Sequence, residues 1–180
     1  MSGGSGVIYG VRLLEVLKRL KVEAHLIIST AAQETLVIET SYKVRYVESL
    51  ASRVYRFNDI AAAPSSGTFR TQGMVVIPCS MKTLAGIASG YSDNLLLRAA
   101  EVTLKERRPL VLVPRETPLT TIHIENMLRV AQAGAILLPA MPGFYDRPMT
   151  IDELVNHVVG KVLDVLNIEH DLYKRWAGPQ

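Results

Sequence analysis

Short apolar segments of strand length alternate with helix-patterned segments along the whole chain, and this alternation limits the possible folds more than any other feature. The apolar runs predict strands at 24–28, 54–57, 74–77, 110–113 and 135–138. The segments between them predict helices over 7–20, 30–39, 44–51, 81–89, 94–106, 122–133 and 151–166. Strands that alternate with helices pair in parallel through right-handed crossovers. We therefore expect an α/β fold with a parallel sheet.

The size and composition of the chain indicate one domain over 1–180. A chain of 180 residues, of which 48% are hydrophobic, can bury a sizeable core. No uninterrupted apolar run is long enough to cross a bilayer, and the first residues lack the pattern of a secretory signal. We therefore expect a cytoplasmic protein with no membrane partner.

The residue counts argue against several kinds of site. A single cysteine, Cys79, excludes an internal disulfide and a multi-thiolate metal site. The four histidines are scattered without ligand-like spacing, so we expect no metal. Two short basic clusters, near 18–21 and 105–108, have no aromatic residues among them, and a solvated helix face explains them better than nucleic-acid binding.

A glycine-rich turn, residues 3–6, comes directly before the first predicted helix. Such a turn leaves backbone N–H groups free to hold an anion, helped by the helix dipole, although a flexible chain start would look the same. The turn normally follows a central strand, whereas only Met1 and Ser2 precede it here. Either the chain is shortened at its start or the sheet lacks a central member. We favour the first explanation and expect the first strand to be missing.

Hydroxyl side chains follow two other predicted strands. Ser29 and Thr30 follow the apolar run at 24–28, and Ser80 and Thr83 follow the run at 74–77. As plain helix caps these residues would look the same. Three anion-ready turns at one sheet edge, however, suit a flat, phosphate-bearing cofactor lying across the strand ends. Cys79 beside them is expected to be a small buried residue, because no histidine is placed to activate it.

Charged residues follow the most apolar predicted strand, Leu110–Val113. Arg115 and Glu116 come next, and Pro118 stops the following residues from continuing the strand or a helix. Ligands of open α/β sheets collect at the carboxyl ends of the strands, so this pair stands at a position typical of chemistry. A strand-end salt bridge is the simpler alternative.

Other charged and aromatic residues indicate a binding site only when they are considered together. Arg98 and Lys105 are seven apart in a predicted helix and so share a face. The alternative is an exposed charged stripe in which Glu101 and Lys105 form a pair worth roughly 0.3–0.5 kcal/mol. Three further candidates, each on its own a surface or packing residue, are Tyr145, Lys161 and Trp176.

Four segments together closely resemble the UbiX-type flavin prenyltransferases. They are the Gly-Gly-Ser-Gly turn with the helix after it, Pro-Cys-Ser-Met-Lys-Thr-Leu-Ala-Gly-Ile at 78–87, Leu-Lys-Glu-Arg-Arg-Pro-Leu-Val-Leu-Val-Pro-Arg-Glu-Thr-Pro-Leu at 104–119, and Pro-Gly-Phe-Tyr-Asp-Arg-Pro at 142–148. The resemblance covers nearly the whole chain. It implies a flavodoxin-like, Rossmann-type three-layer sandwich and a homododecamer built of trimers.

The resemblance also implies an activity. That family joins a dimethylallyl group from dimethylallyl phosphate to reduced FMN, first at N5 and then at C6, without a metal. The product, prenylated FMN, serves UbiD-type decarboxylases. The cofactor contacts implied by position are Gly4, Ser5, Gly6, Ser29, Ser80, Met81, Lys82, Thr83 and Arg115. The residues implied around the prenyl phosphate, some from neighbouring subunits, are Arg98, Lys105, Glu116, Tyr145, Lys161 and Trp176.

Elementary chemistry fits these implied roles. Cations and a tyrosine hydroxyl can stabilise a departing phosphate, and an aromatic surface can stabilise an allylic cation. Ring closure at C6 must release a proton, for which Glu116 is our candidate general acid/base; Ser5 is a weaker candidate for proton movement. The sequence departs from the family pattern in its absent first strand, in Gly4 where alanine is usual, and in Lys161 where arginine is also common.

Three other functions compete with this one. A peptidyl-cysteine decarboxylase of the related superfamily would have a histidine where this chain has Asn58-Asp59-Ile60, and a Pro-Ala-Ser-Ala-Asn-Thr-like segment at 78–83. Both differences argue against it. A non-catalytic carrier of prenylated FMN would retain product without turnover. A decarboxylase would release carbon dioxide without a partner protein.

Overall fold

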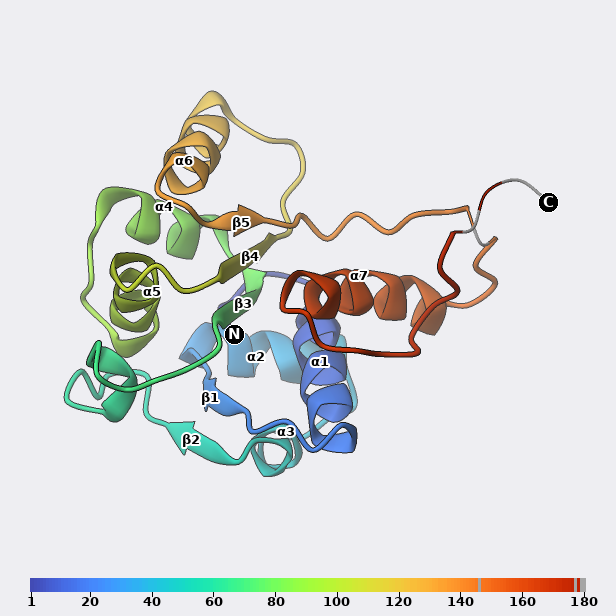
Figure 1. Cartoon of the computed structure of the whole chain (residues 1–180), viewed down its shortest axis with the longest axis horizontal. Coiled ribbons are helices and arrows are strands. Elements are labelled where there is room, and N and C mark those ends of the chain that lie inside the picture. The colour runs from blue at the N-terminus through green and yellow to red at the C-terminus, as the bar shows by residue number, and fades with distance from the viewer. Residues whose placement is uncertain (146, 177, 179–180) are drawn as a thin grey trace.

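The computed structural model describes residues 1–145, 147–176 and 178, and it confirms the alternation of strands and helices (Figure 1). The strands are β1 (His25–Ile27), β2 (Arg53–Tyr55), β3 (Met74–Cys79), β4 (Leu110–Pro114) and β5 (Ile136–Leu137). The helices are α1 (Val7–Arg19), α2 (Thr30–Glu39), α3 (Val44–Leu50), α4 (Met81–Ser89), α5 (Leu95–Lys105), α6 (Thr121–Gln132) and α7 (Ile151–Val165), with a 3-10 turn at Ala63–Ser65. Within the described residues, no helix combines the length and apolarity needed to cross a membrane.

Every strand pair is parallel, as predicted, but the strands form two sheets instead of one. The first sheet contains β1 and β2, with Leu26 opposite Val54; the second has the order β3-β4-β5, with Val111 opposite Val75. Met1 and Ser2 lie between the two sheets. The Met1 amino group donates to the carbonyl oxygen of Ile27 at 2.8 Å. The sheet is divided because only these two residues occupy the central position.

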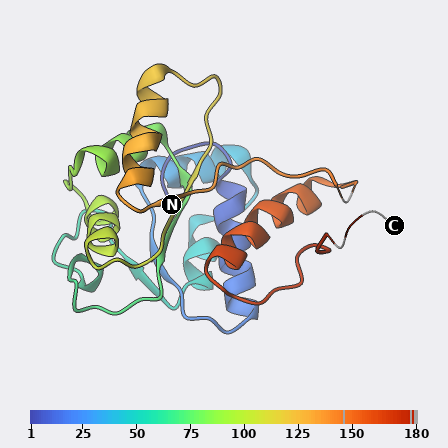
Figure 2. The same cartoon turned by 45° about the horizontal axis from the view of Figure 1, so that its top comes forward.

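Strand β4 is the centre of the core, because all five of its residues are buried. Val111 and Val113 pack with α1 and α7 on one face of the sheet. Leu110 and Leu112 point to the other face, where they pack with α4, α5 and α6. The helices therefore cover both faces, as Figures 1 and 2 show. The two-sided burial that the sequence predicted for this strand is confirmed.

Serine and threonine side chains begin four of the helices that follow loops or strands. Ser29 accepts a hydrogen bond from Ala32 N at 3.1 Å and caps α2, and Ser80 caps α4 in the same way. The remaining hydroxyl caps are Thr120 at α6 and Thr150 at α7. The caps fix where α2 and α4 begin, directly after β1 and β3.

Removing the centre of the core should destabilise the protein strongly. We expect Leu112→Ala to lower the free energy of unfolding by about 2–5 kcal/mol, because the side chain is fully buried and leaves a cavity. The matched change Val54→Ala, on the half-exposed strand β2, should cost less than about 1 kcal/mol. Denaturant unfolding of both variants checks this, and equal losses would contradict the assignment of β4 as the core strand.

Candidate functional site

The glycine turn, the end of β3 and the end of β4 meet at one edge of the molecule. The Ser2 hydroxyl donates to Pro78 O at 3.1 Å and accepts from Ser80 N at 2.8 Å, which ties the turn to the end of β3. Arg115 Nε donates to Ser5 O at 3.3 Å and ties the same turn to the end of β4. The structure thus brings Ser5, Ser80 and Arg115 together, although their roles toward a ligand stay predictions.

The turn also lies directly against the start of α2. A Cβ atom added to Gly3 would lie 2.4 Å from the Cβ of Ala31, so a larger residue at position 3 would push the turn away from the helix. Gly4 is different, because an added Cβ would be 3.6 Å from the Cα of Ser80, an ordinary contact. The alanine expected at position 4 from the family pattern would therefore fit.

Two helix N-termini, those of α2 and α4, point their first turns at this edge. Ser29 and Ser80 cap them, and the Ser80 hydroxyl also donates to Thr83 Oγ1 at 3.0 Å. A helix N-terminus carries partial positive charge from its aligned peptide dipoles. Met81 and Lys82 belong to the same first turn of α4, with Lys82 exposed. The edge is therefore suited to an anionic group.

Two of the N–H groups expected to be free at the start of α1 already have a hydrogen-bond partner. Gly6 N and Val7 N donate to Glu39 Oε2 at 2.8 and 3.3 Å. Glu39 ends α2, and folding brings its carboxylate onto the N-terminus of α1, where the helix dipole favours a negative charge. At these two N–H groups the protein itself supplies the negative charge, and contact of a cofactor with Gly6 stays a prediction.

Glu116 extends beyond the end of β4 and is exposed. Its Oε1 atom accepts a hydrogen bond from Thr117 N at 3.2 Å, which holds the carboxylate within its own loop. Within the described part of the chain, no ion pair joins Arg115 to Glu116, because the guanidinium turns to Ser5 O instead. The alternative of a simple strand-end salt bridge is therefore wrong.

Tyr9 also borders this edge, and sequence reasoning missed it. A Cβ added to Gly6 would lie 3.0 Å from the Tyr9 ring. Burial raises the pKa of Tyr9, while the nearby charge of Arg115 opposes the rise. In the sequence Tyr9 reads only as one residue of an amphipathic helix, so no local pattern would have identified it.

Cys79 is fully buried beside the site, as the sequence predicted. Burial raises the pKa of its thiol to about 12, an effect that the nearby N-terminal amino group only partly opposes. A thiol with so high a pKa is protonated at neutral pH and is a poor nucleophile. Cys79 is therefore a packing residue.

Arg98 and Lys105, the residues on α5 predicted to bind the prenyl phosphate, each pair with a neighbouring carboxylate. Arg98 lies 2.9 Å from Glu101 Oε2, and Lys105 lies 2.5 Å from Glu106 Oε1. A hydrogen bond from Ser92 lowers the pKa of Glu101; burial opposes this, and Arg98 adds to the lowering. The pair predicted between Glu101 and Lys105 is therefore wrong as a direct contact, because each side chain has a nearer partner.

Three of the other residues predicted around the prenyl phosphate, Tyr145, Lys161 and Trp176, line a pocket beside the C-terminal end of α7, whereas Glu116 does not. This C-terminal pocket has a volume of about 370 Å³ and is lined by Gly143, Tyr145, His157, Lys161, Asp164, Tyr173, Lys174, Arg175 and Trp176. The rings of Tyr145 and Trp176 lie with their centroids 5.7 Å apart. Asp146, in the same predicted motif, lies outside the described residues. The pocket thus combines three cationic side chains, those of Lys161, Lys174 and Arg175, with aromatic walls.

Asp164 organises this pocket, and sequence reasoning missed it. It accepts hydrogen bonds from Tyr173, Arg175 and His170, and Lys161 Nζ lies 3.8 Å away. Partial burial alone would raise the pKa of Asp164, but the hydrogen bonds from Tyr173 and Arg175 outweigh it and lower the pKa to about 2. The spacing of Lys161 and Asp164, three apart on a predicted helix, was the available sequence signal.

Gly160 leaves space for the C-terminal tail, which the hydrogen bonds of Asp164 hold against α7. A Cβ atom added to Gly160 would lie 2.3 Å from the ring of Tyr173 and 2.8 Å from that of His170. The C-terminal tail therefore packs closely onto α7 at this position. The tail contacts and the Asp164 bonds together place Trp176 at the pocket.

The residues predicted to surround the prenyl phosphate on α5 and those in the C-terminal pocket lie on opposite sides of the molecule. Helix α5 lies on the side of α4 and α6, whereas α7 and the C-terminal tail lie on the other side, as both views show (Figures 1 and 2). One protomer therefore does not bring Arg98 and Lys105 to Lys161.

With this geometry established, comparisons with known proteins identify the class. A family model described as Flavoprotein matches residues 1–165. The chain is 50% identical over 181 residues to "Flavin prenyltransferase UbiX" of Escherichia coli strain K12, covering 99% of this chain and 96% of the relative. A "Probable UbiX-like flavin prenyltransferase" of Bacillus subtilis strain 168 is 53% identical over 178 residues, 99% of this chain and 87% of that protein. The chain therefore belongs to the flavoprotein family, in its UbiX-type branch.

Solved structures agree with this assignment. AnUbiX in complex with FMN and dimethylallyl pyrophosphate matches with a TM-score of 0.98 and 48% identity, over 100% of this chain and 96% of that one. A dodecameric FMN-dependent UbiX-like decarboxylase of Escherichia coli O157:H7 matches with a TM-score of 0.96 and 51% identity, over 99% and 100%. The flavodoxin-like fold that the sequence predicted is confirmed.

The cysteine decarboxylase alternative is not favoured. The FMN-dependent cysteine decarboxylase TvaF matches with a TM-score of 0.66 but only 16% identity, over 92% of this chain and 94% of that one. A match at this identity shows a shared fold alone.

The tail contacts make a prediction that the single tryptophan of the chain can report. We expect Asp164→Asn to free the tail, because the amide lacks the charge that holds Arg175 and His170, and so to lower the fluorescence anisotropy of Trp176. In the parent protein, this contribution should be complete above a pH of about 4, where the carboxyl is ionised even in the unfolded chain, and disappear as the pH falls toward 2.

The control for this prediction is Asp171→Asn. Asp171 pairs with Arg19 at 2.6 Å and does not line the C-terminal pocket. This variant should leave the anisotropy unchanged. Equal anisotropy in the Asp164→Asn variant and the parent would show that Asp164 does not anchor the tail.

Proposed function

We propose that this chain is a flavin prenyltransferase that joins the dimethylallyl group of dimethylallyl phosphate to N5 and C6 of reduced FMN. The product is prenylated FMN, and the recipient that we propose is a UbiD-type decarboxylase. The observation that carries the proposal is the meeting of Ser5, Ser80 and Arg115 at one edge of a chain about 50% identical to flavin prenyltransferases. The cytoplasmic location expected from the sequence stays part of this proposal.

The strand-tip edge fits a phosphate-bearing flavin. Gly3 and Gly4 have no side chains, and the turn packs closely against Ala31 of α2 and Ser80 at the start of α4. The capped N-termini behind Ser29 and Ser80 favour a phosphate dianion, and Arg115 supplies a fixed positive charge beside the turn. We assign Gly4, Ser5, Gly6, Met81, Lys82 and Thr83 to the remaining contacts. Reduced FMN supplies the nucleophilic N5 and C6 atoms when bound.

The cationic residues would stabilise the departing phosphate. Breaking the allylic carbon–oxygen bond leaves negative charge on the phosphate, and each charge-assisted hydrogen bond to it is worth about 1.5–3 kcal/mol. Lys161 and the Tyr145 hydroxyl line the C-terminal pocket for this purpose, and Arg98 and Lys105 present the same chemistry on α5. Trp176 offers an aromatic face to the allylic cation and keeps water from capturing it.

Glu116 is the residue that we assign to proton transfer. Its carboxylate is exposed next to Arg115, and a single N–H from Thr117 holds it, so one oxygen remains able to accept a proton. Closure at C6 releases a proton, and a positioned carboxylate can take it. The Ser5 hydroxyl, on the same edge, is a second candidate for moving that proton.

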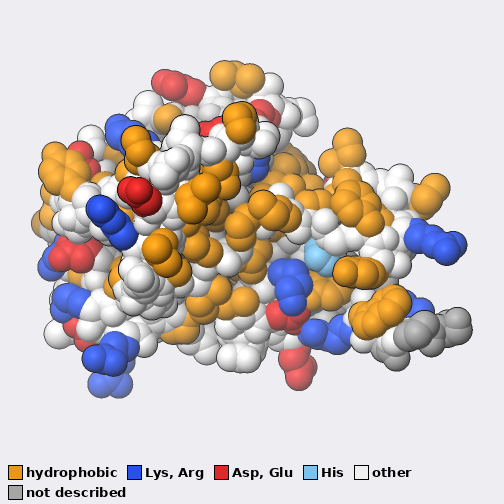
Figure 3. All heavy atoms as spheres, turned by 90° about the horizontal axis from the view of Figure 1, so that it is seen from above, with side chains coloured by type: hydrophobic (Ala, Val, Ile, Leu, Met, Phe, Trp, Pro, Cys, Tyr) orange, Lys and Arg blue, Asp and Glu red, His pale blue; other side chains and the backbone are white. Residues whose placement is uncertain are grey.

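A shared site requires neighbouring protomers, and the surface offers an interface. Large hydrophobic side chains are exposed on α6 and on the segment that leads into α7, and Figure 3 shows such side chains gathered across this face. They include Ile122, Leu128, Met141, Phe144, Met149 and Ile151. Contiguous exposed apolar surface of this kind marks interaction sites. We propose a homododecamer built of trimers, in which α5 of one protomer meets the C-terminal pocket of another.

The direct test of the function mixes the protein anaerobically with reduced FMN and dimethylallyl monophosphate, and measures the mass of the extracted flavin. We expect each flavin to gain the mass of one dimethylallyl group, and each protein molecule to modify many flavins. A parallel reaction with dimethylallyl diphosphate distinguishes the two donors. An unmodified flavin with both donors would refute the proposal, and a carrier would retain added prenylated FMN without forming it.

Loss of the proposed base should slow transfer and spare binding. We expect Glu116→Gln to lower the rate of product formation about 100-fold or more while FMN binds as in the parent, because the amide cannot accept the proton. Glu125→Gln, an exposed position on α6, is the matched control and should keep the parent rate. Parent-like turnover of the Glu116→Gln variant in rapid-mixing assays would remove Glu116 from the mechanism.

Mixed oligomers test whether two protomers share one site. Lys105→Ala and Lys161→Ala should each abolish most activity on their own. When the two variants are co-expressed in one symmetric assembly, about a quarter of the sites should regain activity. Those sites take Lys105 from a protomer that lacks only Lys161, and Lys161 from a protomer that lacks only Lys105. Separately purified variants, combined without subunit exchange, are the control. Co-assembled oligomers with no recovered activity would show that both lysines serve the same protomer.

A further inference from the structure

One face of helix α7 carries three polar side chains, those of His157, Lys161 and Asp164. They are four and three residues apart, a spacing that places them on the same side of a helix. All three line the C-terminal pocket. His157 differs from the other two because its contacts reach the loop at 142–145 as well as the C-terminal tail.

The first contact of His157 holds the loop that carries Tyr145. Gly143 N donates a hydrogen bond to His157 Nδ1 at 3.2 Å. A Cβ atom added to Gly143 would lie 3.1 Å from Nε2 of the same ring, so the loop backbone packs directly on the imidazole. The Tyr145 side chain is 82% exposed, so burial does little to fix it. The position of the loop backbone therefore decides where the Tyr145 hydroxyl lies.

The second contact of His157 reaches the tail that carries Trp176. The rings of His157 and Tyr173 lie with their centroids 5.2 Å apart, within the range of favourable aromatic pairs. The Tyr173 hydroxyl donates to Asp164, which anchors the tail. The rings of Tyr145 and Trp176, which come from the loop and the tail, lie 5.7 Å apart. His157 thus contacts the backbone that places one ring and the side chain that helps to place the other.

We propose that His157 is a positioning residue that holds the Tyr145 loop and the Trp176 tail in one arrangement, so that the C-terminal pocket is formed before the prenyl donor binds. Because the proposed function places the phosphate of the donor in this pocket, the role of His157 rests on that function. A pocket formed in advance does not lose the entropy of ordering a loop on binding, and the donor therefore binds more tightly. His157 acts through Gly143 and Tyr173.

An imidazole suits this role because it combines a hydrogen-bond acceptor with an aromatic ring. Phenylalanine would keep a ring against Tyr173 but leave Gly143 N without its acceptor. Asparagine would keep an acceptor, because its Oδ1 is bonded to Cγ as Nδ1 is in histidine, but would lose the ring. The substitutions His157→Phe and His157→Asn therefore separate the two contacts.

The first measurement follows these contacts without reference to catalysis. We expect His157→Phe to speed hydrogen–deuterium exchange at the Gly143 amide by about tenfold or more, and His157→Asn to leave it as in the parent. The fluorescence anisotropy of Trp176, the single tryptophan, should fall in His157→Asn and stay parent-like in His157→Phe. Parent-like exchange in His157→Phe, or parent-like anisotropy in His157→Asn, would overturn the proposal.

The second measurement tests whether the contacts serve donor binding. We expect His157→Phe to raise the KM for dimethylallyl monophosphate by about tenfold, while the Kd of FMN stays as in the parent and kcat changes by less than about threefold. A lower thermal midpoint with an unchanged donor KM would show a packing role and overturn the proposal. Failure of the proposed function is recognised separately, because the parent itself would then form no prenylated FMN.

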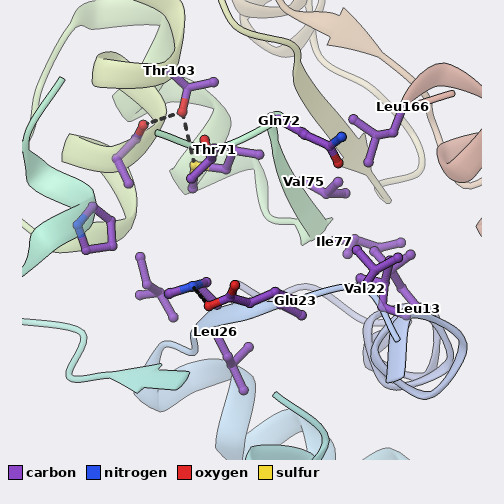
Figure 4. Close-up of a pocket in the computed structure, with 18 of the residues that line it drawn as sticks. Leu13, Val22, Glu23, Leu26, Thr71, Gln72, Val75, Ile77, Thr103 and Leu166 are labelled. Atoms are coloured by element: carbon purple, nitrogen blue, oxygen red, sulfur yellow. Dashed lines mark hydrogen bonds and ion pairs between the residues drawn. The ribbon is translucent and has the colours of Figure 1, made fainter. Parts of the chain in front are cut away.

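The matched control is His25→Phe. His25 is also an imidazole beside a tyrosine ring, with its centroid 5.6 Å from that of Tyr55 and its Nδ1 atom 2.9 Å from the Tyr55 hydroxyl. It lines a separate groove of about 400 Å³, between Leu26 of β1 and Val75 of β3 (Figure 4). Among the described residues, this groove and the C-terminal pocket have no lining residue in common.

The control should change none of the three readouts. We expect His25→Phe to leave the exchange of Gly143, the anisotropy of Trp176 and the donor KM as in the parent. An equal rise of the donor KM in His25→Phe and His157→Phe would show a general effect of losing an imidazole from the fold, and it would overturn the positioning role of His157.

Discussion

The hydrogen bonds of Met1 and Ser2 hold the rest of this structure in place. They attach the end of β1 to the end of β3 and so fix the glycine turn between the first turns of α2 and α4. Without that attachment, Ser29 and Ser80 would follow strands of two separate sheets, and no common edge would bring them together. Arg115 then reaches the same turn from β4. One short stretch of backbone thus brings the strand tips together.

The opposite end of the molecule is arranged by charge. Asp164 gathers Lys161, Arg175, His170 and Tyr173, and its low pKa reflects how strongly these partners favour the ionised form. A bound phosphate would be a second anion, besides the Asp164 carboxylate, for Lys161 and Arg175 to pair with. The Asp164 carboxylate therefore organises the pocket at the place where a negatively charged phosphate would also be attracted. The tail and the proposed substrate would bind the same basic residues.

Much of the fold could be predicted because its signals are local. The apolar run at β4 and the hydroxyl caps Ser29 and Ser80 mark strands and helix starts through nearest neighbours alone. The errors have a common cause. Glu39 on the N-terminus of α1, and Ser92 with Arg98 around Glu101, are partners chosen by packing, and no sequence spacing identifies them. The roles of the site residues toward a ligand remain predictions.

The sequence by itself determined the alternating elements, their parallel pairing, the strand-end location of Ser80 and Arg115, and the UbiX-type family. Periodicity and motif carry that information along the chain without reference to distant residues. Only the tertiary structure decided that the sheet divides around Met1 and that Asp164 anchors the tail. It also decided that the residues predicted to bind the prenyl phosphate lie on two opposite sides of the molecule, on α5 and in the C-terminal pocket. Those features depend on which backbone and charged groups meet in space, and a buried group takes whichever partner the packing leaves beside it.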